Sequence, residues 1–215
     1  MKLLDVDGPL ISFLSSAFDF FVIFLLTVLF SIPVITAGAA MTAAQYVGMK
    51  IIRKEAPGVF KAYFHAFKVN FKQATLLWLV QLLLILFLLF DWYVVFSVGW
   101  NVVPLVYRVL LVLASFVVLI FNLMLYAVIS RFELKFKDAM KVSMVLSMAN
   151  SPFLAIVVAC IGLTAFLCIW FFNLLPAFFV IGFTGTTALH ALITNRALEK
   201  MRKKMEETSN SEEGA

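Results

Sequence analysis

The sequence contains few of the residues on which soluble catalytic sites depend. Charged residues make up only 13% of its 215 positions, and there are two histidines and two cysteines. It has no phosphate-binding glycine loop and no HExxH, CxxC or GxSxG pattern. The histidines lie in different predicted helices, and Cys160 and Cys168 share one apolar run, so neither a metal site nor a disulfide is expected. We therefore expect no catalytic residues, no bound metal, no cofactor and no enzymatic activity.

Apolar residues are abundant instead. They make up 64% of the chain and include 24 phenylalanines, against roughly 45–50% apolar residues in soluble domains. A soluble fold of this size could not bury so much apolar surface, so lipid must solvate most of it. The sequence therefore predicts an all-α, multi-pass membrane protein built as a helical bundle.

The basic residues indicate how the chain is oriented. In a soluble protein the net charge of +5 would suggest nucleic acid, but here fifteen of the seventeen basic residues fall into three clusters, at 50–72, 131–141 and 196–204. The positive-inside rule places these clusters and the C-terminus in the cytoplasm of a plasma-membrane protein. We therefore expect a bilayer with an anionic inner leaflet as a partner, and no nucleic acid.

Six transmembrane helices are predicted within a single transmembrane domain, residues 1–196. They cover residues 10–32, 36–53, 74–96, 104–130, 152–172 and 177–195. A tight turn is expected from Asn173 to Pro176. Residues 197–215 are expected to form a charged cytoplasmic tail that starts as a helix and becomes partly disordered.

The count of six depends on a weak internal repeat. Pro33 to Arg53 and Pro176 to Arg196 each begin with a proline after an apolar run, pass through small residues and end in a basic residue. If the segments correspond, both cross from outside to inside, and the N-terminus is cytoplasmic. The alternative has five spans, with one helix kinked at Pro33, the chain from Ala43 onward in the cytoplasm, and the N-terminus outside.

Two amphipathic linkers join the predicted hairpins. In the first, residues 57–73, one helix face carries Phe60, Phe64, Phe67 and Phe71. The neighbouring face carries Lys61, His65, Lys68 and Lys72. Such a helix lies flat among the headgroups of an anionic leaflet. It would hold the next span in place or, alternatively, bind a ligand or partner. The second linker, residues 131–150, has Glu133, Lys137 and Lys141 on one face.

Polar residues inside the predicted spans are candidates for an intramembrane polar site. They are Asp19, Gln45, Asn122 and His190. Three of them also have a structural interpretation. Asp19 would cap a helix that begins at Phe20, Asn122 would bond to a neighbouring helix, and His190 would be a packing residue with its hydrogen bonds satisfied.

Small residues spaced four apart predict close helix packing. In the second span they are Thr36, Ala40, Ala44 and Gly48, and in the last span they include Gly182 and Thr186.

The segment PVITAGAAMTAAQYVGMKIIR, followed by FKAYFHAFKVNFKQATLLWL, resembles the signature of the YesL-like bacterial membrane proteins (domain of unknown function 624). The match is carried by Pro33, Thr36, Gly38, Ala39, Thr42, Ala43, Arg53, Phe64, Phe67, Asn70, Phe71 and Gln73. It covers roughly the first 90 residues. The resemblance implies a Gram-positive-type plasma-membrane protein, often encoded beside sugar ABC transporters and polysaccharide-degrading enzymes. It implies no catalytic residues.

Two functions follow as hypotheses. In the first, the protein assists or regulates carbohydrate uptake through contact with a sugar ABC permease or another membrane protein. In the second, it is a small transporter or channel whose polar path is lined by the four polar candidates. A membrane-embedded enzyme is a third and weaker reading, because no acid, base, nucleophile or metal set is recognisable.

Overall fold

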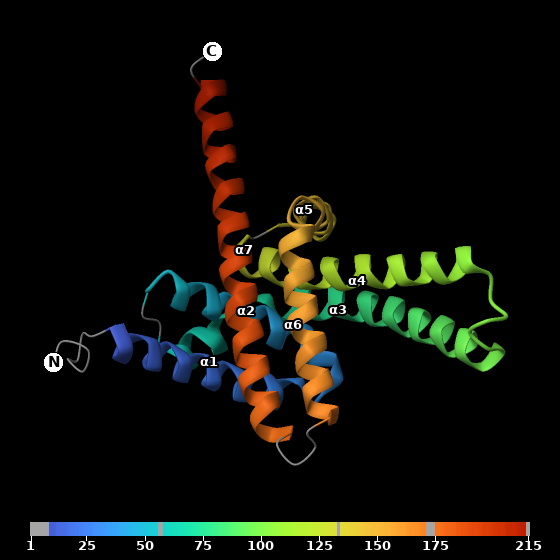
Figure 1. Cartoon of the computed structure of the whole chain (residues 1–215). Helices are drawn as coiled ribbons and strands as arrows, with labels where there is room; N and C mark the ends of the chain where they lie inside the picture. The colour runs from blue at the N-terminus through green and yellow to red at the C-terminus, as the bar shows by residue number, and fades with distance from the viewer. Residues whose placement is uncertain (1–8, 56–57, 133, 171–174, 214–215) are drawn as a thin grey trace.

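Helices make up nearly all of the described part of this computed structural model, which covers residues 9–55, 58–132, 134–170 and 175–213 (Figure 1). In chain order the elements are α1 (Pro9–Ser31), the 3-10 turn η1 (Val34–Thr36), α2 (Ala37–Ile52), α3 (Val59–Val98), α4 (Leu105–Arg131), α5 (Phe136–Ala149), α6 (Ser151–Trp170) and α7 (Leu175–Glu213). The all-α fold predicted from the composition is confirmed.

Helix α2 lies at the centre of this arrangement. It contacts α1, α3, α4 and α7, and twelve of its sixteen residues are buried. Its many alanine, glycine and threonine side chains are small enough for four helices to approach its backbone. At Gly38 an added Cβ would lie 2.7 Å from the carbonyl oxygen of Ala74 in α3, so this contact requires glycine.

The chain reverses direction at Pro33. The hydroxyl of Thr36 hydrogen-bonds to the carbonyl oxygens of Phe30 and Pro33, at 2.6 and 2.8 Å, and closes the turn between α1 and α2. Helix α2 then packs back along α1, so that Gly48 lies against the ring of Phe20. The single kinked helix of the five-span alternative is therefore not formed.

Helix α3 joins two elements that were predicted separately. Residues 57–73 were expected to form an interfacial linker and residues 74–96 a span, but one helix of 40 residues runs through both. At about 1.5 Å per residue it is roughly 60 Å long. The separation was wrong because neither glycine nor proline occurs between Gly58 and Gly99, so no residue ends the helix at the junction.

The first half of α3 is amphipathic, but the phenylalanines are not its buried face. That face is formed by Tyr63 and Ala66. Phe64 and Phe67 contact the ring of Phe30 in α1, with centroids 5.3 and 5.0 Å apart. The outer side of the helix exposes Phe60 and Phe71, and also Lys61, His65, Lys68 and Lys72.

The α3–α4 hairpin extends away from the other helices (Figure 1). Its outer part exposes large apolar side chains on both helices, including Leu83, Phe87, Phe90, Val106 and Leu110. At its far end Trp92, Phe96 and Trp100 stack on one another. The guanidinium of Arg108 lies 5.1 Å from the Trp100 ring centroid, a cation–π geometry suited to a membrane interface.

The C-terminal helices differ from the prediction in their ends. The predicted linker, residues 131–150, contains α5, which meets α6 at a bend of 87°. The turn expected at Asn173 to Pro176 lies mostly outside the described residues. Helix α7 passes through Arg196 without a break and continues to Glu213, so the structure shows helix where the tail was expected to become disordered.

Within the described residues, three helices are long and apolar enough to cross a membrane. They are α1 from Leu14 to Ser31, α3 and α4. The bent α5–α6 pair adds a fourth if it is counted as one span. The chain is thus a multi-pass membrane protein with three to four candidate spans, and the six-span topology stays a prediction.

Candidate functional site at the α2–α7 interface

The polar side chains that the fold brings together lie where α2 crosses α7. We define the α2–α7 interface as residues 45–53 of α2 and its C-terminal cap together with residues 190–195 of α7. Its successive contacts are Gln45 with His190, Gly48 with Ala191, and Arg53 with Asn195. These contacts advance along both helices in the same direction. That relation matches the common direction expected for the two segments of the internal repeat.

The first contact is a buried hydrogen-bonded pair. Gln45 Nε2 lies 2.7 Å from His190 Nδ1, and the two residues are only 8% and 4% exposed. Gln45 Oε1 is also buried and has no hydrogen-bond partner among the described residues. A buried pair of this kind ties two helices together because separating them would leave polar groups without water or partner.

The other two polar candidates are not part of this pair. Asp19 is half-buried inside α1, which begins at Pro9, so the reading of Asp19 as a helix cap is wrong. Asn122 is half-buried in α4. Neither side chain forms a hydrogen bond within the described part of the chain, including the interhelical bond expected of Asn122. The structure therefore joins two of the four candidates.

The small residues expected at helix contacts occupy several different positions. Ala40 and Ala44 are buried in α2, whereas Thr36 precedes the helix and closes the turn at Pro33. A Cβ added to Gly182 would collide with the side chain of Thr164, so α6 and α7 approach closely there. Thr186 is half-buried and bonds to the Gly182 carbonyl oxygen at 2.7 Å.

A pocket of about 490 Å³ opens at the end of the α2–α7 interface. We call it the basic pocket. It is lined by Tyr46, Met49, Lys50, Arg53, Glu55, Ser130, Arg131, Glu199, Arg202 and Lys203. The lining contains five basic and two acidic side chains, and the basic ones come from all three clusters seen in the sequence. The positive-inside rule predicted that the clusters share one side of the membrane, but it did not predict that they meet.

The C-terminal turn of α2 forms one wall of the basic pocket. Lys54 has a φ of 58°, a left-handed conformation that is uncommon for a residue other than glycine. The next amide, of Glu55, donates a hydrogen bond to the Lys50 carbonyl oxygen at 3.1 Å. This turn directs the Glu55 carboxylate back toward the helix, where it pairs with Arg53 and lies 3.9 Å from Lys50 Nζ.

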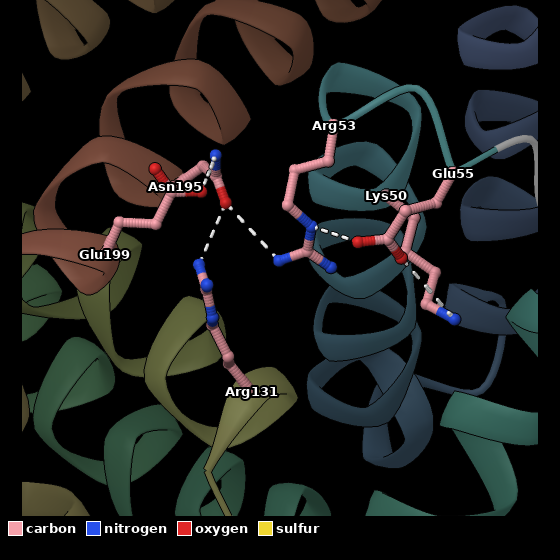
Figure 2. A network of polar contacts seen from close by, with 6 residues as sticks. All are labelled: Lys50, Arg53, Glu55, Arg131, Asn195 and Glu199. Carbon is pink, nitrogen blue, oxygen red and sulfur yellow. Dashed lines mark hydrogen bonds and ion pairs between the residues drawn. The ribbon is translucent and has the colours of Figure 1, made fainter. Parts of the chain in front are cut away.

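Asn195 is buried beside the pocket and joins three helices (Figure 2). Its Oδ1 accepts hydrogen bonds from Arg131 at 2.8 Å and from Arg53 at 3.4 Å. Its Nδ2 donates to Glu199 at 3.0 Å. Two guanidinium groups thus meet at one neutral amide oxygen. Of the two carboxylates, Glu55 pairs with Arg53, and Glu199 accepts from the Asn195 amide nitrogen.

Comparison with known proteins concerns the N-terminal part of the chain. Residues 21–92 match the model of the family described as "Protein of unknown function, DUF624". This segment is similar to a DUF624 domain. It confirms the resemblance predicted from the sequence. The domain includes Gln45 and Arg53, whereas His190, Arg131 and Asn195 lie outside the matched residues. Searches of curated proteins and of solved structures found no match.

Proposed function

We propose that this DUF624 membrane protein is a non-enzymatic accessory or regulator of carbohydrate uptake that contacts a sugar ABC permease. The observation that supports it is how the polar side chains buried between the helices are used. Several of them bond to one another or to backbone within the described residues. Besides Gln45 and His190, Tyr126 donates to Gln81 at 3.0 Å, and Tyr63 donates to the Ala40 carbonyl oxygen at 3.2 Å. A protein with such an interior acts most simply through its surface.

The surface that we assign to the partner is the outer part of the α3–α4 hairpin. Its exposed leucine, valine and phenylalanine side chains form an apolar face that the other described helices leave uncovered. We choose a sugar permease as the partner because of the family resemblance, which implies that the gene often lies beside genes for such transporters. The basic residues support a plasma-membrane location with the basic pocket and the C-terminus in the cytoplasm.

Site-specific photocrosslinking tests this contact. A photoreactive residue at Phe87 of the hairpin, which is 64% exposed, should crosslink to a permease subunit in intact cells. The matched control is Phe18 of α1, which is 65% exposed and should not. Deleting the gene should also lower uptake of the transported sugar. Equal crosslinking from both positions, or unchanged uptake in the deletion strain, would contradict the proposal.

A second candidate function is transport through the protein itself. The observation that favours it is the direct contact of Gln45 with His190, since it joins two candidates that are 145 residues apart in the chain. This alternative predicts that purified protein in vesicles carries a solute or proton flux that is lost in both Gln45→Ala and His190→Ala. Flux absent from the unmodified protein, or retained in both variants, would exclude it.

A further inference from the structure

We propose that the basic pocket binds a phosphate group, carried either by an anionic lipid headgroup or by a small soluble molecule. The proposal is independent of any role in carbohydrate uptake. It rests on the charge of the pocket, the geometry of its arginines and its position at the helix ends.

The charge of the pocket is not balanced by the side chains that line it. Five basic residues face two carboxylates. Glu55 is paired with Arg53 and Lys50, and Glu199 accepts a hydrogen bond from Asn195. Within the described residues no carboxylate lies within ion-pair distance of Arg131, whose bonded partner is the neutral amide of Asn195. Because the basic side chains of the lining outnumber its carboxylates, an added anion would offset the excess positive charge.

The two arginines are arranged in a way that suits phosphate. Arg53 and Arg131 come from different helices, yet both donate to the same oxygen atom of Asn195. This shared bond holds two positive groups close together. Glu55 pairs with Arg53 but not with Arg131, so an anion that contacts both arginines would offset their repulsion. Guanidinium groups present planar forks of N–H donors that match phosphate oxygens in pairs.

The size and position of the pocket indicate what the phosphate is attached to. About 490 Å³ is more than a bare phosphate ion needs, so the pocket has room for a glycerol or similar polar group. Arg131 ends α4, and Arg53 caps α2, so the pocket lies at the ends of helices, where headgroups meet water. A lipid headgroup and a soluble phosphate ester could both reach it.

The test uses the full-length protein in a neutral detergent and phosphate-free, low-salt buffer. One arm adds phosphatidylglycerol or phosphatidylcholine with identical acyl chains and measures retained lipid by native mass spectrometry. The other arm titrates glycerol 3-phosphate and follows the thermal unfolding temperature. Retention of phosphatidylglycerol alone identifies a lipid headgroup site, and a saturable rise in unfolding temperature identifies a soluble phosphate site. No binding in either arm overturns the proposal.

Substitution then assigns the binding to the pocket. Arg131→Gln should weaken binding about tenfold or more, as expected for loss of a charge-assisted hydrogen bond. Arg196→Gln is the matched control: it removes the same charge from an exposed position on α7 outside the pocket lining, and should bind as the unmodified protein does. Equal binding in Arg131→Gln and the unmodified protein, or equal losses in both variants, contradicts the assignment.

Ligand-free stability separates a binding role from a structural one. Because Arg131→Gln relieves repulsion from Arg53, its unfolding temperature without ligand should equal or exceed that of the unmodified protein. A marked fall in this temperature, with an undiminished ligand response, would show that Arg131 only stabilises the fold. If Arg131→Gln does not fold, Arg131→Lys keeps the charge but loses the fork, and should fold and bind with intermediate strength. Unchanged binding by Arg131→Lys would then overturn the role given to the guanidinium.

Discussion

The two ends of the α2–α7 interface are built from the same pair of helices but have opposite character. At one end Gln45 and His190 are buried and bonded to each other. At the other end Arg53 lines a pocket with surplus positive charge, and Asn195 bonds to Arg53 beside it. The buried end is enclosed because Gly48 lets α1 and α7 approach α2 closely. The open end arises because α2 ends at Ile52 while α7 continues.

This difference indicates which polar residues are suited to ligands. A buried, hydrogen-bonded pair gains little from a ligand that would first have to separate its members. Side chains that are partly exposed and share too few acceptors gain a partner when an anion binds. Polar residues inside the apolar helices therefore point to the packing of this protein, and the basic residues at the helix ends point to its ligand.

The largest expected loss of stability comes from a substitution at Gly48, which lies between the two ends of the α2–α7 interface. A Cβ added at Gly48 would lie 3.2 Å from Ala191 Cβ and 3.3 Å from the Phe20 ring, so Gly48→Leu has no room for its side chain. We expect a loss of about 1–3 kcal/mol or more, with low recovery of monodisperse protein in mild detergent. Gly162→Leu on α6 is the control, because no atom lies within 4 Å of a Cβ added there. Similar recovery of the two variants would show that α2 and α7 are not tightly packed.

Much of this interface could be anticipated from the sequence. The small residues after Pro33 predicted a closely packed second helix, because only small side chains let several helices meet. The repeat of Pro33–Arg53 and Pro176–Arg196 predicted that the two segments run in the same direction. Both expectations concern spacing along the chain, which a sequence states directly.

The meeting of Arg53, Arg131 and Asn195 could not be anticipated in the same way. It depends on how far each helix is rotated about its axis, and several core packings would leave the same apolar stripes buried. The length of α3 was a different kind of error. The change from a basic amphipathic stretch to an apolar one suggests a boundary, although a helix ends only where backbone or capping residues end it.

A smaller effect is expected for the buried pair. Gln45→Ala and His190→Ala should each lower stability by about 1–3 kcal/mol, because each leaves a buried polar partner unsatisfied. The coupling between the two substitutions should be about 0.6 kcal/mol, as is common for hydrogen bonds between membrane helices. Unfolding of the two single variants and the double variant in mixed micelles measures this coupling. Phosphate binding should be retained in all three variants. If the stability losses of the two single variants simply add up in the double variant, the pair does not stabilise the interface.

The smallest expected effect concerns Glu55, the carboxylate that turns back toward Arg53 and Lys50. Because this ion pair is partly exposed, Glu55→Gln should lower stability by less than about 1 kcal/mol. The same substitution removes a negative charge that competes with the ligand, so glycerol 3-phosphate should bind about twofold more tightly in low salt. That gain should shrink near physiological salt, where the screening length falls to about 8 Å. Asp138→Asn on α5 removes an equal charge outside the pocket lining and should leave affinity unchanged. If Glu55→Gln instead binds the ligand more weakly at unchanged stability, Glu55 orients Arg53 toward the ligand. Its carboxylate would then favour ligand binding rather than compete with it.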